Sequence, residues 1–386
     1  MRRLVFLVML FIIFTPAGAR AADMAYDMSS YWSDPALSGE LESLDGAIDA
    51  VSSYLGEALD TGALQQLWQR VKNGELPVDI NLLWRVPLAA MLGALPAAVK
   101  VLGQLVVLAA FGLLLVHLPG RGIAPLARQV VYLALFGVVL QVFVQAGGAA
   151  SGAVEEMSSF LYALLPVLLT LLASLGAPST VALYNPLLLA AIGSSLHLLR
   201  ILVLPLLYIS GALTVGGSIS PSLKFAGLAK LCRDIGMGVF GIMLTLFGAL
   251  LGLLGVSGAV LDGLGVRAAK SAAGVFIPVV GRTLADSLDA VVSTALLLKN
   301  LIGVLGLVIL LLLCIMPAVR ILVYSLLFRL VGALVEPLGD SRLAGILSSM
   351  GGIVLLFFGI VAISGLFFFF IVSITIGMGN LVVAIR

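Results

Sequence analysis

Residues 300–319 read NLIGVLGLVILLLLCIMPAV, a stretch without one charged side chain. An α-helix rises 1.5 Å per residue, so about 20 apolar residues can cross the hydrocarbon core of a bilayer. Gly303 and Gly306 within the stretch leave room for a neighbouring helix to approach closely. The stretch therefore predicts a membrane-spanning helix, and the fold depends on how often the chain repeats this pattern.

The remainder of the chain has the same character. It contains 386 residues, of which 61% are hydrophobic and 10% are charged, whereas a soluble domain is about 25% charged. Further stretches long and apolar enough to span a membrane lie at 101–118, 129–147, 158–176, 186–215, 236–256 and 351–376. With 300–319 they give about seven spans and predict an all-α fold, a polytopic transmembrane helical bundle.

The N-terminal end differs from this pattern. Residues 1–22 combine a basic start, an apolar run and a small-residue end, which predicts a cleaved signal peptide; an uncleaved anchor helix is the alternative. Residues 23–85 are polar, with Leu41, Leu44, Ile48, Val51, Leu55 and Leu59 at steps of three and four. This spacing predicts a short extracytoplasmic segment of amphipathic helices that packs on the membrane domain, on lipid or on a partner.

The membrane domain is predicted to cover residues 86–386. Its first part, 86–98, is apolar but short and contains two prolines, which predicts an interfacial or re-entrant piece. If residues 23–85 lie outside, the loop with Arg121 and Arg128 lies inside, as the positive-inside rule requires. Seven alternating spans would then place the basic residues near 224–233 outside, against that rule. The sequence leaves the topology after the third span open.

His197 and Arg200 are the basic residues of the 186–215 span, and they share one helical face because they are three positions apart. A central arginine costs about 2.5–3.5 kcal/mol on insertion scales, so it is expected to face protein or water. One hypothesis is a polar spot that lines a pathway. The alternative is that Pro205 breaks the span and Arg200 extends to the interface from a short helix end.

The 236–256 span carries small residues at steps of three and four. These include Gly241, Gly248, Gly252 and Gly255. Such a stripe predicts close helix packing, either within the chain or between copies of it.

Residues 262–299 predict an amphipathic or re-entrant hairpin that turns at Pro278 and Gly281. After the turn, Arg282, Asp286 and Asp289 fall on one helical face. Asp286 and Asp289 suit a proton relay; the alternative is a solvated face on which Arg282 pairs with Asp286. The helix is also expected to be able to continue into 300–319.

The sequence predicts no enzyme. Two histidines and two cysteines do not form a usual zinc site, and the Gly before Lys in a phosphate-binding loop is replaced by Ala269 ahead of Lys270. We therefore expect no catalytic residues, no cofactor and no metal. The net charge of +2 also excludes a broadly basic nucleic-acid surface.

The chain resembles the stage III sporulation protein AE family. The resemblance is carried by RAAKSAAGVFIPVVGRTLADSLDAVVSTALLLKNLIGVLGLVIL at 267–310, LLPVLLTLLASLGAPST at 164–180, NPLLL at 185–189 and RLVGALVEPLGDSR at 329–342. It implies a structural membrane component of a secretion-like channel complex that links mother cell and forespore and supports forespore development after engulfment.

The same resemblance implies the partners and the location. The partners would be other membrane proteins of one sporulation operon, with a forespore-side partner and an oligomer as further options, together with membrane lipid. The chain would lie as a multi-pass protein in the mother-cell membrane around the forespore. The alternative function is a stand-alone secondary transporter or permease, although the chain shows no internal repeat of the kind many transporters have.

Overall fold

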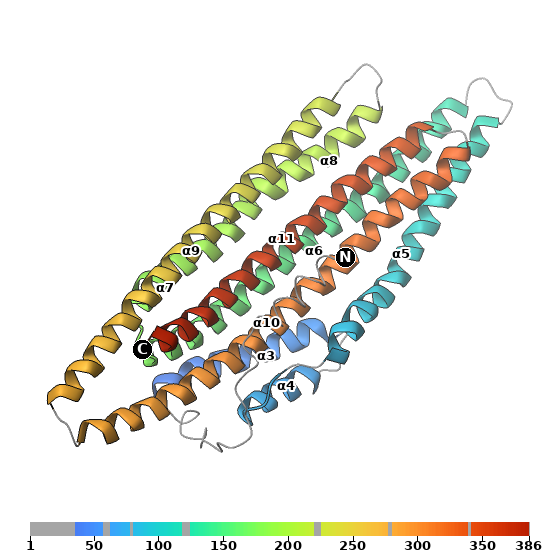
Figure 1. The fold of residues 1–386 in the computed structure, drawn as a ribbon. Helices are drawn as coiled ribbons and strands as arrows, with labels where there is room; N and C mark the ends of the chain where they lie inside the picture. The colour runs from blue at the N-terminus through green and yellow to red at the C-terminus, as the bar shows by residue number, and fades with distance from the viewer. Residues whose placement is uncertain are drawn as a thin grey trace.

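The computed structural model describes residues 35–56, 62–77, 80–117, 124–219, 225–276, 280–338 and 341–385. Every regular element in these ranges is helical. Long helices run side by side along one axis and form an elongated bundle, as Figure 1 shows. The predicted all-α bundle is therefore confirmed.

In the described residues, the bundle is built from six helical units with apolar segments long enough to cross a membrane. They are α5 (Ile80–His117), α6 (Ala124–Ser174), α7 (Pro178–Leu198) continued by a π-helical turn (Leu199–Val203) into α8 (Leu204–Ile219), α9 (Ala226–Phe276), α10 (Val280–Val335) and α11 (Ser341–Ile385). The α10–α11 pair is the most extensive helix contact. At the edges, α5 packs on α6 and α10, and α9 packs on α7, α8 and α11.

Within the described residues the structure has six candidate spans, where the sequence predicts about seven. The expected spans 129–147 and 158–176 are a single helix, α6, and the Gly-, Ala- and Ser-rich stretch between them continues it. Ala150, Ala153 and Val154 in that stretch are fully buried. Small residues there let neighbouring helices approach, so the stretch is an interhelical contact rather than a loop.

Residues 86–98 also differ from the prediction, because they are part of the continuous helix α5 with Pro87 and Pro96 inside it. A proline removes one backbone hydrogen bond but does not end a membrane helix whose freed groups find other partners. Pro205 has a different effect. The π-helical turn at Leu199–Val203 lies directly before it, where the missing N–H and the ring of Pro205 disturb the regular α-helical pattern.

The 262–299 segment joins two long helices. Residues 262–276 belong to α9 and residues 280–299 to α10, so the amphipathic helix does continue into 300–319. Gly281 lies in the first turn of α10, whereas Pro278 lies outside the described residues. At the opposite end of the bundle the chain passes from α5 to α6, from α8 to α9 and from α10 to α11 (Figure 1).

Two shorter helices precede the bundle. Helix α3 (Pro35–Leu55) packs mainly on α6, and α4 (Gly62–Lys72) packs on α10 and α3. The predicted apolar stripe of α3 is buried at Leu41, Leu44, Ile48, Val51 and Leu55. On α4 the buried residues are Leu64, Leu67, Trp68 and Val71. The amphipathic helices are thus attached to one half of the bundle, with their polar faces outward.

Candidate functional site

Three groups of polar side chains connect different helices of this apolar bundle. The first group lies between α10 and α11 and consists of Lys299, Asn300, Gly379 and Asn380, which we call the lysine cluster. Lys299 is fully buried, and its Nζ donates a hydrogen bond to the backbone carbonyl of Ile376 at 2.7 Å. Within the described part of the chain, this ammonium has no carboxylate partner.

Gly379 makes the space for that ammonium. A Cβ added at this position would overlap Nζ of Lys299. It would also lie 2.8 Å from Cε of Lys299 and 3.1 Å from Cδ1 of Leu175. Any residue other than glycine would therefore displace the lysine or separate the helices. The sequence places a glycine where α11 has to pass a buried cation.

The two asparagines extend the lysine cluster. Nδ2 of Asn300 donates to Oδ1 of Asn380 at 3.2 Å, while Oδ1 of Asn300 is buried without a partner among the described residues. Ionisable and amide side chains at membrane depth are costly, and they mark functional positions or polar contacts between helices. The cluster connects the two helices that form the centre of the bundle.

The second group is a helix cap supplied by a different helix. Asp262 on α9 accepts hydrogen bonds from the backbone N–H of Thr180 at 2.7 Å and from its hydroxyl at 2.6 Å. Thr180 lies in the first turn of α7, and the N-cap residue Ala177 has no side chain that could do this. Asp262 therefore satisfies an N-terminal donor of α7 and interacts favourably with the helix dipole. Gly258 leaves room for the Thr180 side chain, because a Cβ there would be 2.9 Å from its Oγ1.

The third group is an ion pair on the outer surface. Arg200 lies in the π-helical turn, and its guanidinium donates a hydrogen bond to the Glu155 carboxylate on α6. The side chains are 47% and 46% exposed, and His197, three positions before Arg200, is exposed as well. The structure thus places His197 and Arg200 on the outer wall of the bundle.

The C-terminal end of α3 lies close to charged residues of α6 and α10. Burial raises the pKa of the Tyr54 hydroxyl on α3, the carboxylate of Glu156 raises it further, and Arg320 on α10 opposes the increase. Both burial and a nearby anion disfavour the tyrosinate form. Tyr54 is consequently a neutral residue close to Glu156 of α6.

The glycines of the predicted packing stripe have unequal surroundings. A Cβ at Gly255 would lie 2.8 Å from Sδ of Met378 and 3.1 Å from Cγ2 of Ile374, so α9 touches α11 there. Gly248 has only an ordinary neighbour, the ring of Phe367, at 3.9 Å from the added Cβ. Nothing lies within 4 Å of a Cβ at Gly241 or Gly252.

The predicted polar face after the hairpin lies at the start of α10. Arg282, Asp286 and Asp289 are in its first three turns, but their side chains are outside the described residues. They therefore remain sequence-based predictions, as does the turn at Pro278 and Gly281.

A cleft of about 750 Å³ lies between α3 and α4. Its lining includes Asp45, Asp49, Gln65, Arg70 and Lys72. Gln65 donates to Asp49 at 3.4 Å, and the ammonium of Lys72 lies 5.1 Å from the ring centre of Trp68. Asp49 and Lys72 thus each already interact with an uncharged side chain of the cleft. Among the residues searched, no group of His, Cys, Asp and Glu side chains could hold a metal ion.

Sequence reasoning missed the lysine cluster, the Asp262 cap and the partner of Arg200. A single lysine before an apolar run marks Lys299 as unusual, but its neighbours are about 80 positions away in the chain. Glu155 lies between the expected spans 129–147 and 158–176, so the sequence does not mark it as a partner for Arg200. None of these three contacts has a local sequence pattern.

Together, the six apolar helical units and their polar interhelical contacts define a polytopic, all-helical membrane protein. The family model for stage III sporulation protein AE matches residues 63–379. The chain therefore belongs to the stage III sporulation protein AE family, and the resemblance seen in the sequence is confirmed.

A relative of known name supports the same assignment. The chain is 34% identical over 291 residues to Stage III sporulation protein AE of Bacillus subtilis (strain 168). The matched region covers 74% of this chain and 73% of that protein. No solved structure matches the chain.

Proposed function

We propose that this chain is a structural membrane subunit of a multi-protein sporulation complex. The complex would join mother cell and forespore through a secretion-like channel and would support forespore development after engulfment. The observation that carries the proposal is the family match, which extends over almost the whole described bundle. The subunit would act by assembly, without catalysis or a cofactor, in the mother-cell membrane around the forespore.

The distribution of polar groups supports an assembly role. The lysine cluster and the Asp262 cap each join two helices of the bundle. Polar contacts of this type fix which helices pair and in which register. The amphipathic helices α3 and α4 add an outward polar surface to one half of the bundle, which suits contact with other subunits outside the membrane.

Deletion and co-purification test this function. Deleting the gene in a sporulating host is expected to arrest spore formation after engulfment. A tagged copy extracted in mild detergent is expected to recover the other membrane proteins of its operon. Normal spore yield after deletion, or recovery of the chain without any of those proteins, would contradict the proposal.

A stand-alone secondary transporter is the second candidate, and the buried Lys299 is the observation that favours it. An ionisable residue at membrane depth is by default a functional hypothesis. His197 and Arg200 do not support a route through the bundle, because both lie on its outer wall. Purified chain in liposomes would then transport a solute without partners, and Lys299→Met would abolish that flux. If the chain acts only by assembly, liposomes with the wild-type protein show no flux.

A further inference from the structure

The outer wall between α6 and α7 combines an ion pair with apolar surroundings; we call this surface the α6–α7 seam. Arg200 and Glu155 pair there with both side chains about half exposed. Nearby on the same chain segments, Ile201 is 62% exposed and Tyr162 on α6 is 41% exposed. The apolar neighbours indicate a surface that faces lipid or protein, whereas the ion pair is unsuited to lipid.

The ion pair leaves hydrogen-bonding capacity unused. An arginine has five N–H donors and a carboxylate has about four lone-pair sites, and a single hydrogen bond joins Arg200 to Glu155. Glu155 and Arg200 lie within Gln129–Ser174 and Pro178–Gly217, two apolar segments long enough to span a membrane. In hydrocarbon the remaining groups would have no partner, and a charged residue at membrane depth almost always faces protein or a water-filled cavity. A protein surface that supplies both a carboxylate and a guanidinium would satisfy both residues.

A second copy of the chain supplies this pair. Copies inserted into one membrane have the same orientation, so a two-fold axis between them runs along the membrane normal and preserves height. Glu155 and Arg200 lie at one height, because they bond to each other. Across such an axis, Arg200 of one copy therefore lies at the same height as Glu155 of the other copy. By symmetry, Glu155 of the first copy lies at the same height as Arg200 of the second.

We propose that the α6–α7 seam is a self-association surface through which two copies pair about a two-fold axis. The two ion pairs of the separate chains become one four-residue network across the interface. Tyr162, on the same helix as Glu155 and two turns away, lies close to the axis. The inference does not depend on the proposed sporulation role, since it concerns the chain alone and is tested without other sporulation proteins.

The central experiment exchanges charges between two differently tagged copies. Glu155→Arg gives a chain with two positive charges in the seam, and Arg200→Glu gives a chain with two negative charges. Each variant is expected to lose self-association in bilayer nanodiscs. Co-expressed, the two variants are expected to co-purify at least tenfold better than either variant with itself, because the charges are complementary only between chains. The matched control reverses Arg233 and Asp234, an ion pair on α9 with an N–O distance of 3.6 Å, and is expected to leave association unchanged.

A second measurement does not depend on the folding of the charge variants. In a background with Cys232 and Cys314 replaced, Tyr162→Cys is expected to form a disulfide-linked dimer in oxidising membranes. Leu253→Cys on α9, a residue that is 68% exposed, is the control and is expected to remain monomeric. A wild-type chain that is monomeric in nanodiscs, equal recovery of like and unlike charge variants, preferential cross-linking at Leu253→Cys, or Tyr162→Cys linked only to another protein would each overturn the proposal.

Discussion

Lys299 shows how one glycine can determine whether two membrane helices fit together. Its ammonium reaches a backbone carbonyl of α11 only because Gly379 has no side chain. A buried cation is costly to desolvate, and it is tolerated when hydrogen bonds and close protein neighbours hold it. The cation and the glycine are thus one structural unit, contributed by two helices distant in sequence.

Gly379→Ala is expected to destabilise the bundle by about 1–3 kcal/mol, the usual cost of an overpacked core. Lys299 is fully buried, so its end cannot swing away to make room. Thermal unfolding of the purified protein in detergent measures the effect. Gly377→Ala is the matched control on α11, because nothing lies within 4 Å of a Cβ there. Equal melting temperatures of the two variants would show that the lysine can reposition at no cost.

At the scale of the element, α7 illustrates a helix start that its own sequence does not complete. Pro178 suits the first turn and Gly176 adopts a φ of +91°, which favours glycine, but Ala177 offers no capping oxygen. The carboxylate of Asp262 on α9 provides the acceptor instead. The start of α7 therefore depends on the packing of α9.

Asp262→Ala is expected to lower stability by about 1 kcal/mol, the typical value of an N-terminal cap. Asp262→Asn keeps an acceptor oxygen and is expected to recover part of the loss. Unfolding curves in detergent with added denaturant compare these variants with Ser257→Ala, an exposed position of the same helix whose hydroxyl donates to the carbonyl of Leu253 one turn before it. The prediction fails if the Ala and Asn variants at 262 are equally stable and match Ser257→Ala.

At the scale of the whole molecule, the helices are longer than a membrane is thick. Helix α10 has 56 residues, which corresponds to about 84 Å, whereas a bilayer with its headgroups measures about 40–45 Å. Part of the bundle therefore extends beyond the lipid. Helices α3 and α4, with their polar outer faces, cover the half away from the α5–α6, α8–α9 and α10–α11 connections (Figure 1).

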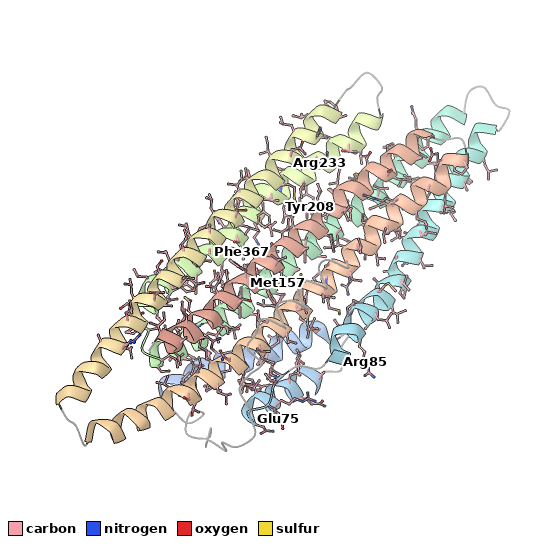
Figure 2. All side chains as sticks on the ribbon, in the orientation of Figure 1. Glu75, Arg85, Met157, Tyr208, Arg233 and Phe367 are labelled. Carbon is pink, nitrogen blue, oxygen red and sulfur yellow. The ribbon has the colours of Figure 1, made fainter. Side chains whose placement is uncertain are left out.

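The merged helix α6 also changes how the charges are distributed between the two ends. The connections after α5 and after α8 lie at the same end (Figure 1). Arg128 at the start of α6 and Lys230 at the start of α9 therefore lie toward that end, as does Arg233, which Figure 2 labels. Arg329 and Arg342, which flank the α10–α11 connection, add to this basic character. The conflict with the positive-inside rule arose from counting α6 twice.

This arrangement predicts opposite sides for two exposed positions. In a chain without its native cysteines, Glu42→Cys on α3 is expected to react with a membrane-impermeant maleimide in intact spheroplasts. Lys230→Cys on α9 is expected to react only after permeabilisation, because basic ends remain cytoplasmic. Labelling of both cysteines from the same side, or from the reversed sides, would contradict this topology.

The sequence by itself determined the class of the protein. Long apolar runs required membrane helices, the stripe from Leu41 to Leu55 required an amphipathic helix, and the motifs at 267–310 indicated the family. These features are local, since hydropathy and periodicity are properties of one segment.

Only the tertiary structure decided which polar groups meet. Glu155 with Arg200, Thr180 with Asp262, and Lys299 beside Gly379 are 45, 82 and 80 positions apart. It also decided that the small-residue stretch inside α6 is helical, because neighbouring helices bury it. The physical reason is the same in each case. A buried charge, a helix start and an alanine face all find their partners on other helices. A single segment of sequence does not contain those partners.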